Sequence, residues 1–401
     1  MKTKILVRGP VLSQSGYGEQ ARFALRALRS QEDKYDIHIQ PLRWGNTGWI
    51  WEDTEERRWI DNMITKTANY SREGGSFDAS LQITIPNEWE QIAPVNIGYT
   101  AGIETDRVAP AWLFKADQMD KIVVVSDHSK KVFKETIAEG KHPANGQNIK
   151  YNLTKPIESV VYSISSHKQE AIPGFNLSTN FNFLCVSQWG PRKNFRNTIK
   201  WWVEEFHDQS VGLILKTSIA NNSQVDKTKT EEVVSSILSD YKDRKCKVYI
   251  LHGDLSAGQM KWLYTNKKVK CLVNLAHGEG FGLPMFEAAQ CGLPVMTIGW
   301  SGQMDYLVQE GKEYFVKIDH KMDTIQDSAV WDQVLQADSK WAYAEQGSFK
   351  MQLRKFKKDW KKYKTQATSL QKIINDKYTE ENMYKKFCSA IEFNDINKIV
   401  I

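Results

Sequence analysis

Short apolar runs alternate with helical patterns along almost the whole chain. Continuous apolar runs are typical of strands buried in a parallel sheet. Such runs occur at 3–9, 35–41, 81–85, 95–99, 121–126 and 157–164, and again at 181–187, 211–216, 247–251, 271–275 and 294–298. Helical patterns lie between many of them, at 16–30, 129–139, 231–240, 256–266 and 347–376, and another places Ile199, Trp202, Val203 and Phe206 on one face. This alternation predicts an α/β protein with two doubly wound parallel sheets, which are Rossmann-like domains facing each other across a cleft.

The length of the chain also favours two domains. At 401 residues it exceeds the size at which a single core stops growing. The best candidate for a linker is the polar, non-periodic stretch 165–180, which contains Pro173 and Gly174. We therefore expect an N-terminal domain over 1–170, a second domain over 178–376, and a separate C-terminal segment over 377–401.

One segment carries most of the candidate chemistry. The run 271–275 is followed by a loop with glycines at 278, 280 and 282, then by Pro284 and a short helical stretch that Gly292 ends. Such a loop directs backbone N–H groups and the positive end of a helix at a ligand, commonly a phosphate. Glu279 lies in the loop and Glu287 in the helix, with seven residues between them. Carboxylates beside an anion site suggest a ligand that also carries hydroxyl groups, such as a nucleotide sugar.

These residues resemble the signature of a known family. Glu279-x7-Glu287 within Gly-Glu-Gly-Phe-Gly-Leu-Pro is similar to the motif of retaining GT-B glycosyltransferases of the glycosyl-transferase group 1 type. The resemblance implies that Glu279 faces the donor sugar and that Glu287 binds the ribose. It further implies that the loop residues Gly280, Phe281, Gly282 and Leu283 hold the sugar and diphosphate. An ordinary strand-loop-helix connection is the structural alternative.

Three other segments extend the resemblance. Lys193 matches the family's lysine beside the donor diphosphate, where a fixed cation would stabilise the departing charge. Gln188 stands where the family usually has an arginine, so either Arg192 supplies that charge or the phosphate is held with one cation fewer. The glycine turn at Ser301 and Gly302 corresponds to one that lies under the donor phosphate and sugar in relatives. The C-terminal segment would cross back to the N-terminal domain.

The N-terminal half contributes two further candidates. Gly16 and Gly18 lie in the loop before the first helix, which in the family faces the donor phosphate and the acceptor; an ordinary βα turn is the alternative. Glu104, in the segment Gly-Ile-Glu-Thr-Asp, follows a strand at its carboxyl end and resembles a family segment beside the cleft. The alternative there is that Thr105 or Asp106 caps a helix.

Tryptophans cluster between the second and third predicted strands. Trp44, Trp49 and Trp51 lie in a stretch with turn-forming residues, and Trp59 and Trp89 follow. Exposed indoles are platforms for sugar rings or bases, whereas buried indoles fill a core. We expect the 44–51 cluster to serve the acceptor.

Charge is concentrated in one helix. The chain carries a formal net charge of +6, and residues 349–364 alone carry eight Lys or Arg against Asp359. This basic helix could bind DNA or an anionic membrane surface, or it could simply be solvated. No run approaches the roughly 20 apolar residues that a membrane span needs. The five cysteines form no CxxC pair, which argues against a disulfide framework or structural zinc. We expect a cytoplasmic protein.

The sequence thus predicts a retaining, metal-independent glycosyltransferase. The donor would be a UDP- or GDP-type nucleotide sugar acting as co-substrate, with no other cofactor, and the acceptor a saccharide or glycoconjugate. Glu279, Lys193 and Glu104 are the candidate catalytic residues, and no Asp-x-Asp metal motif is present. The alternatives are transfer to hydroxylated bases of DNA, or a non-catalytic module that binds nucleotide sugars or nucleic acid.

Overall fold

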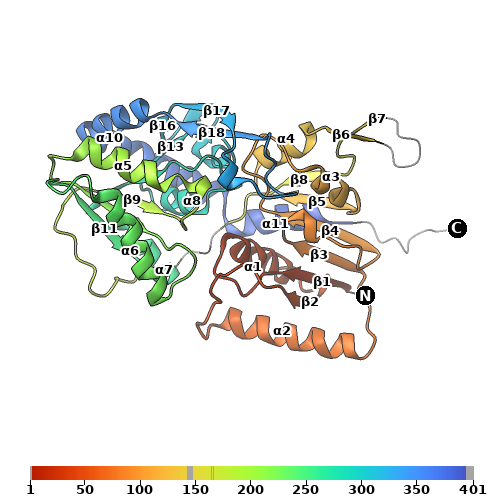
Figure 1. The fold of residues 1–401 in the computed structure, drawn as a ribbon. Helices are drawn as coiled ribbons and strands as arrows, with labels where there is room; N and C mark the ends of the chain where they lie inside the picture. Colours follow the sequence, from red (N-terminus) through yellow and green to blue (C-terminus); the bar gives the residue numbers. More distant parts are fainter. Residues whose placement is uncertain (1, 142–147, 164, 166, 394–401) are drawn as a thin grey trace. The chain divides into compact units, whose positions relative to one another are not determined.

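The structure is a computed structural model that describes residues 2–141, 148–163, 165 and 167–393. It divides into two compact units (Figure 1). Unit 1 comprises residues 1–103, 107–164 and 378–401, and unit 2 comprises 104–106 and 165–377. Residues 142–147 and the end of the predicted C-terminal segment (394–401) lie outside the described residues.

Unit 1 is built on one six-stranded sheet in the order β2-β1-β3-β4-β5-β8, and every neighbouring pair is parallel. Its elements are β1 (Thr3–Gly9), α1 (Gly16–Arg29), β2 (Tyr35–Pro41), α2 (Glu55–Arg72), β3 (Ala79–Ile83), the 3₁₀ helix η1 (Pro86–Glu88), β4 (Val95–Thr100), α3 (Pro110–Asp117), β5 (Lys121–Val124), α4 (Asp127–Glu135), the hairpin strands β6 (Ala138–Lys141) and β7 (Asn148–Tyr151), β8 (Ile157–Ser159) and α11 (Glu380–Ile391).

Helix α11 is the last element of unit 1. It packs against α1, where the ring of Phe387 meets that of Phe23 with centroids 5.5 Å apart. Cys388 lies in the same contact, and its Sγ donates to the carbonyl oxygen of Ala27. The apolar face of α1 predicted from its spacing is therefore covered by residues more than 350 positions away, which sequence periodicity cannot show.

Unit 2 also has one six-stranded parallel sheet, in the order β11-β10-β9-β12-β13-β16. Its elements are β9 (Asn182–Val186), η2 (Pro191–Lys193), α5 (Phe195–Phe206), β10 (Gly212–Lys216), α6 (Gln224–Leu238), β11 (Lys247–Leu251), α7 (Ala257–Thr265), β12 (Val269–Asn274), α8 (Leu283–Gln290), β13 (Val295–Ile298), α9 (Met304–Leu307), β14 (Val308–Gln309), β15 (Lys312–Glu313), β16 (Val316–Ile318), β17 (His320–Thr324), η3 (Asp327–Ala329), β18 (Lys340–Ala344) and α10 (Gln346–Lys377).

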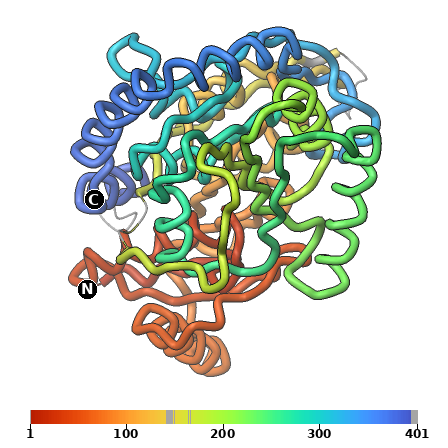
Figure 2. Tube along the Cα trace, turned by 90° about the vertical axis from the view of Figure 1, so that its left-hand side faces the viewer, coloured from red at the N-terminus to blue at the C-terminus, as the bar shows by residue number. Residues whose placement is uncertain are grey.

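The long helix α10 closes the core of unit 2. It lies against α5, α8 and β16 and can be followed in blue in Figure 2. The predicted apolar stripe is confirmed, because Phe349, Leu353 and Phe356 are fully buried and Trp360 and Tyr363 pack against the same core. The backbone of Asp359 departs from helical geometry, so the predicted single helix is kinked there.

The α/β prediction with two parallel sheets is confirmed, but several element boundaries were wrong. The helix predicted at 231–240 begins earlier, at residue 224, because the hydroxyl of Ser223 caps α6 by accepting from the N–H of Asp226. The predicted helix 129–139 stops at residue 135, where the hydroxyl of Thr136 donates to the carbonyl oxygen of Val132. Helix α2 and the hairpin β17–β18 were not predicted, since their apolar positions become clear only when the partner surfaces are known.

Candidate functional site

The strand order of unit 2 creates a switch point between the parallel strands β9 and β12, because the chain continues from β9 to β10 on one side and from β12 to β13 on the other. Strands β9 and β12 lie side by side although β10, β11 and the helices that connect them separate the two strands in the chain. Ligands of open parallel sheets bind at such a switch point, outside the carboxyl ends of the strands. The loop 187–194 follows β9 and the loop 275–282 follows β12, so the two predicted site segments meet here.

A cluster of four charged side chains forms at this meeting point. Glu279 accepts from Lys193, with 2.6 Å between Oε1 and Nζ, and from Arg192, with 2.9 Å between Oε2 and Nη1. Arg192 also pairs with Glu104, whose Oε1 lies 3.2 Å from Nη2. The side chain of Glu279 is only 8% exposed. Three candidate catalytic residues and Arg192 are therefore assembled from segments up to 175 positions apart.

The electrostatics of the cluster follow from burial and pairing. Burial would raise the pKa of Glu279, but the charges of Lys193 and Arg192 outweigh it and lower this pKa from 4.5 to about 2. The pKa of Lys193 is lowered, first by burial and then by the charge of Arg192. The pKa of Arg192 is raised by Glu104 and Glu279 against the effect of burial. At neutral pH Glu279 is thus a carboxylate held between two cations.

Backbone contacts fix the position of Arg192. Its Nη1 donates to the carbonyl oxygen of Gly278 at 2.6 Å, and its own carbonyl oxygen accepts from the N–H of His277 at 2.9 Å. The turn after it requires a left-handed residue, which is Asn194 at φ 52°. The loop after β9 and the loop after β12 are therefore joined by main-chain bonds as well as by charge.

The turn 299–303 forms hydrogen bonds with the main chain of Glu279. Ser301 holds φ at +80°, a conformation that non-glycine residues rarely adopt. Its Oγ accepts from the N–H of Glu279 at 3.0 Å and donates to Gln303 at 2.7 Å. The N–H of Gly302 donates to the carbonyl oxygen of Glu279 at 2.9 Å, and a Cβ added at Gly302 would lie 2.0 Å from the carbonyl oxygen of Gly280. Only glycine fits there.

The glycine loop itself runs directly into helix α8. Gly282 caps α8 at φ 83°, and Pro284 occupies the first turn of the helix after Leu283. The hydroxyl of Tyr306 donates to the carbonyl oxygens of Phe281 and Gly282, at 3.0 and 2.8 Å. Phe281 is buried and its ring lies 5.4 Å from that of Tyr306, between centroids, which anchors the loop.

Glu287 has a partner that the sequence did not indicate. Its Oε2 accepts from the hydroxyl of Tyr264 on α7 at 2.7 Å. Tyr264 is buried, and burial together with Glu287 raises its pKa well above 10, so it stays a donor at neutral pH. This bond holds the half-buried carboxylate of Glu287 in one orientation.

The side chain of Gln188 forms hydrogen bonds with the main chain of a neighbouring loop. Its Nε2 donates to the carbonyl oxygens of Ile219 and Ala220, at 3.2 and 3.0 Å. Asp226 holds the same loop by accepting from the N–H groups of residues 219–221 and from Nε2 of His252. Gln188 therefore ties the loop after β10 to the loop after β9.

His277 is a site residue to which the sequence gave no role. Its Nδ1 donates to the carbonyl oxygen of Ala342 at 2.8 Å, and its ring stacks on Trp341 with centroids 4.9 Å apart. Burial lowers its pKa from 6.5 to about 4, so the ring is neutral at pH 7. It fastens the hairpin β17–β18 to the glycine loop. Its position directly before Gly278 was the only available signal.

Unit 1 presents its own loops at the carboxyl ends of β1 and β4. A Cβ added at Gly18 would lie 1.9 Å from the carbonyl oxygen of Ser13, whereas Gly16 has open space around it. Close approach therefore requires glycine at position 18 only. The hydroxyl of Tyr17 bonds that of Thr100 at 2.7 Å and links α1 to the end of β4.

The tryptophans divide by exposure. Trp49 is 55% exposed and Trp51 is 72% exposed, while Trp89 is fully buried. Trp44 lies against Tyr17 with ring centroids 4.2 Å apart. The loop that carries these indoles is bonded to the loop after β1, because the N–H of Gln14 donates to the carbonyl oxygen of Gly48 at 2.8 Å.

The segment after β4 does not cap a helix. The N–H of Asp106 donates to the carbonyl oxygen of Lys340, and its Oδ1 accepts from the N–H of the same residue at 2.7 Å. Ala109 precedes α3 and provides no side-chain cap. The capping alternative for Thr105 and Asp106 is therefore wrong, and the segment belongs to unit 2 through β18.

Half of the eight basic side chains of residues 349–364 form ion pairs or hydrogen bonds within unit 2. Lys350 pairs with Glu204 at 2.6 Å, and Arg354 pairs with Glu205 at 2.5 Å. Lys357 and Lys364 donate to Gln209 and to the carbonyl oxygen of Gly292. The remaining four, which are exposed, are Lys355, Lys358, Lys361 and Lys362.

None of the described helices is long and apolar enough to cross a membrane. Within the part of the chain that the structure describes, no group of three or more His, Cys, Asp or Glu side chains is arranged to hold a metal ion.

Comparison with known proteins gives a likeness of fold. No protein-family model and no curated protein matches the sequence. Sucrose-phosphate synthase from Thermosynechococcus elongatus has a TM-score of 0.63 at 10% identity, covering 97% of this chain and 98% of that one. A glycosyltransferase from Rickettsia africae gives 0.57 at 10%, covering 98% and 100%. A structure described as trehalose-6-phosphate from E. coli bound with UDP-2-fluoro glucose gives 0.54 at 11%, also covering 98% and 100%. These likenesses support the GT-B fold class expected from the sequence.

Proposed function

We propose that this chain is a retaining, metal-independent glycosyltransferase that takes a sugar from a nucleotide-diphosphate donor bound by unit 2. The observation that carries the proposal is the cluster of Glu279, Lys193 and Arg192 at the switch point between β9 and β12. Two fixed cations beside a glycine-rich loop suit a diphosphate, and a carboxylate beside them suits sugar hydroxyls. The fold shared with solved glycosyltransferases agrees with this assignment.

Arg192 and Lys193 are the two cations that we assign to the diphosphate. Gln188 is committed to the loop after β10, so Arg192 is the residue able to replace the arginine that the family usually has there. Without ligand, Glu279 is paired with both cations. A bound diphosphate would take over that role and free Glu279 to accept from hydroxyls of the donor sugar. Glu104 would keep Arg192 in place throughout.

The transfer step needs no separate base on the protein. The acceptor hydroxyl oxygen forms a bond to the anomeric carbon, the bond from that carbon to the diphosphate oxygen breaks, and the hydroxyl proton passes to the departing diphosphate. In the ligand-free chain the charges of Lys193 and Arg192 lower the pKa of Glu279 to about 2, which makes it a poor base and a poor nucleophile. This favours proton transfer to the leaving group on the same face, which gives retention. Lys193 and Arg192 would stabilise the charge on the leaving diphosphate.

Metal independence and the acceptor class rest on separate observations. Two side-chain cations are present where a metal would otherwise neutralise a diphosphate, which favours metal independence. The exposed indoles of Trp49 and Trp51 favour a saccharide or glycoconjugate as acceptor. Glu287, oriented by Tyr264, is assigned to the ribose hydroxyls.

The test is release of nucleoside diphosphate from a panel of UDP and GDP sugars, with and without oligosaccharide acceptors. We expect release from at least one donor, and we expect Lys193→Gln and Arg192→Gln each to lower kcat by about a hundredfold or more. Arg196→Gln is the matched control, because Arg196 is an exposed cation on the adjoining turn of α5. Binding of a donor without any release would indicate a non-catalytic module. Equal losses in all three variants would refute the assignment of the two cations.

A further inference from the structure

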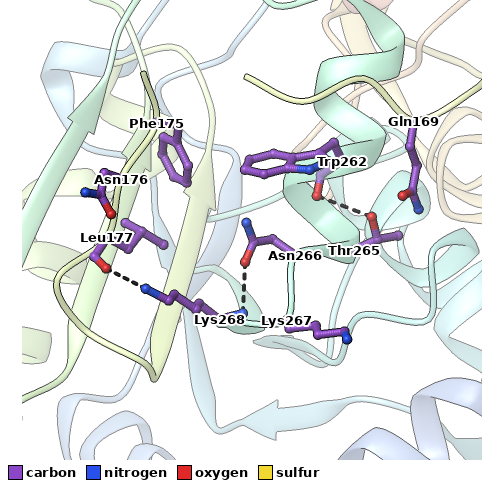
Figure 3. A pocket seen from close by; sticks show the side chains of 9 residues that line it. All are labelled: Gln169, Phe175, Asn176, Leu177, Trp262, Thr265, Asn266, Lys267 and Lys268. Carbon is purple, nitrogen blue, oxygen red and sulfur yellow. Dashed lines mark hydrogen bonds between the residues drawn. The ribbon is translucent and has the colours of Figure 1, made fainter. Parts of the chain in front are cut away.

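A second candidate site lies in unit 2, at the amino-terminal ends of the strands and so on the side of the sheet opposite to the glycine loop. The glycine loop leaves the carboxyl end of β12, whereas this pocket is formed where β9 and β12 begin. Its volume is about 430 Å³, within the range of roughly 300–1,000 Å³ that is usual for ligand sites. Gln169, residues 175–177, the end of α7 and the residues just before β12 line it (Figure 3).

Two aromatic rings form one side of the pocket. Phe175 and Trp262 meet edge to face, with centroids 5.7 Å apart and an interplanar angle of 84°. Both side chains are half-buried, so part of each remains accessible to solvent. Figure 3 shows the two rings beside each other. An apolar ring face next to polar groups is the surface on which a sugar ring packs through its C–H groups.

Polar side chains surround the rings. Asn266 accepts from the N–H of Lys268 through Oδ1 at 2.9 Å, which leaves its amide NH₂ as a donor. The exposed amides of Asn176 and Gln169 add further donors and acceptors. Such a mixture of amides and aromatic rings matches the hydroxyl groups and apolar faces of saccharides.

The pocket also has a positive charge that nothing in its lining balances. Lys267 and Lys268 belong to the lining, and none of the described residues that line it is acidic. Lys268 donates to the carbonyl oxygen of Leu177 at 2.7 Å, while Lys267 is exposed. Lys270 continues the positive strip. It donates to the carbonyl oxygen of Lys267 and lies 4.5 Å from the centroid of the Trp360 ring on α10.

We propose that this pocket binds an anionic oligosaccharide, a sugar chain that carries carboxylate or phosphate groups. One sugar ring would pack on Trp262 and Phe175, the amides would meet its hydroxyls, and Lys267, Lys268 and Lys270 would meet its charges. The edge-to-face arrangement leaves no parallel slot between the rings for a flat base, which favours a sugar over a single-stranded nucleic acid. The site is separate from the switch point, and the proposal does not depend on the transfer reaction.

The test measures binding without any nucleotide sugar. Short oligogalacturonates are the carboxylated probe, maltopentaose is the neutral probe, and oligothymidylate is the nucleic-acid probe, each titrated calorimetrically at low and at moderate salt. We expect oligogalacturonate to bind at low salt. Trp262→Ala should weaken it about tenfold, and Lys267→Glu should weaken it severalfold and flatten its salt dependence.

Matched controls come from the same unit. Trp331 is 56% exposed and Lys321 lies on β17, so Trp331→Ala and Lys321→Glu make the same chemical changes away from the pocket and should leave binding unchanged. Trp262→Tyr keeps a ring in place and should retain most of the affinity if Trp262→Ala proves unstable. The proposal is overturned if oligogalacturonate does not bind, if the pocket and control variants behave alike, or if maltopentaose or oligothymidylate binds as tightly.

Discussion

Replacing Glu279 by glutamine tests the charge cluster directly. The substitution keeps the shape of the side chain and removes the charge that Lys193 and Arg192 share. Arg192 keeps Glu104 as a partner, but the ammonium of Lys193 loses its only carboxylate among the ion pairs of the described residues. Because these groups are largely buried, water cannot replace the lost interaction fully.

The size of the effect follows from the pKa. A carboxyl whose pKa is about 2 in the folded chain and 4.5 in the unfolded chain stabilises the fold by about 3 kcal/mol at pH 7. The sign is that of a depressed acid: the contribution is complete above about pH 5 and is lost as the pH falls towards 2. About half of it should remain at pH 3. The stability difference between wild type and Glu279→Gln should shrink accordingly.

The assay is urea unfolding followed by tryptophan fluorescence at a series of pH values from 7 to 3. Glu313→Gln is the control, since Glu313 forms an ion pair with Lys317 that is about half exposed and should contribute little. If the chain unfolds in two transitions, only that of unit 2 should move. The reasoning is refuted if Glu279→Gln costs no more than Glu313→Gln at pH 7, or if its cost is undiminished at pH 3.

Four further outcomes are expected. Transfer activity should survive EDTA, and complete loss with recovery on adding Mn²⁺ or Mg²⁺ would contradict metal independence. Gly302→Ala should abolish donor binding and cost about 1–3 kcal/mol of stability, because its Cβ would collide with the carbonyl oxygen of Gly280. Gly347 has open space around it, so Gly347→Ala should change neither thermal unfolding nor nucleotide binding, the two measurements that check this prediction. His277 has a pKa of about 4 in the folded chain and 6.5 in the unfolded chain, so it makes the fold less stable as the pH falls from 6.5 to 4. His277→Phe should reduce this loss of stability in urea titrations. An unchanged dependence of stability on pH would argue against the burial of His277 as a neutral ring. Replacing Trp49 and Trp51 together by alanine should raise KM for a saccharide acceptor without changing donor affinity, and an unchanged acceptor KM would remove the tryptophan loop from the site.

The sequence alone determined the features that depend on neighbouring residues. Apolar runs such as 121–126 and 271–275 are strands because a buried strand of a parallel sheet must be apolar on both faces. The glycine loop before α8 could be located because glycine, proline and a helical pattern follow one another within a few positions. Composition and periodicity were also sufficient for the fold class, since alternation of strands and helices allows few other arrangements.

Only the tertiary structure decided which side chains meet. Glu279 has no charged partner near it in the sequence, and its partners Lys193 and Arg192 are supplied by a strand that becomes adjacent through the order of the sheet. The same holds for Tyr264 and Glu287, and for the burial of Trp89 against the exposure of Trp51. Contacts of this kind are made across the sheet, where the distance along the chain carries no information. A local pattern can therefore position a loop, but the fold determines its charge, its pKa and its ligand-binding chemistry.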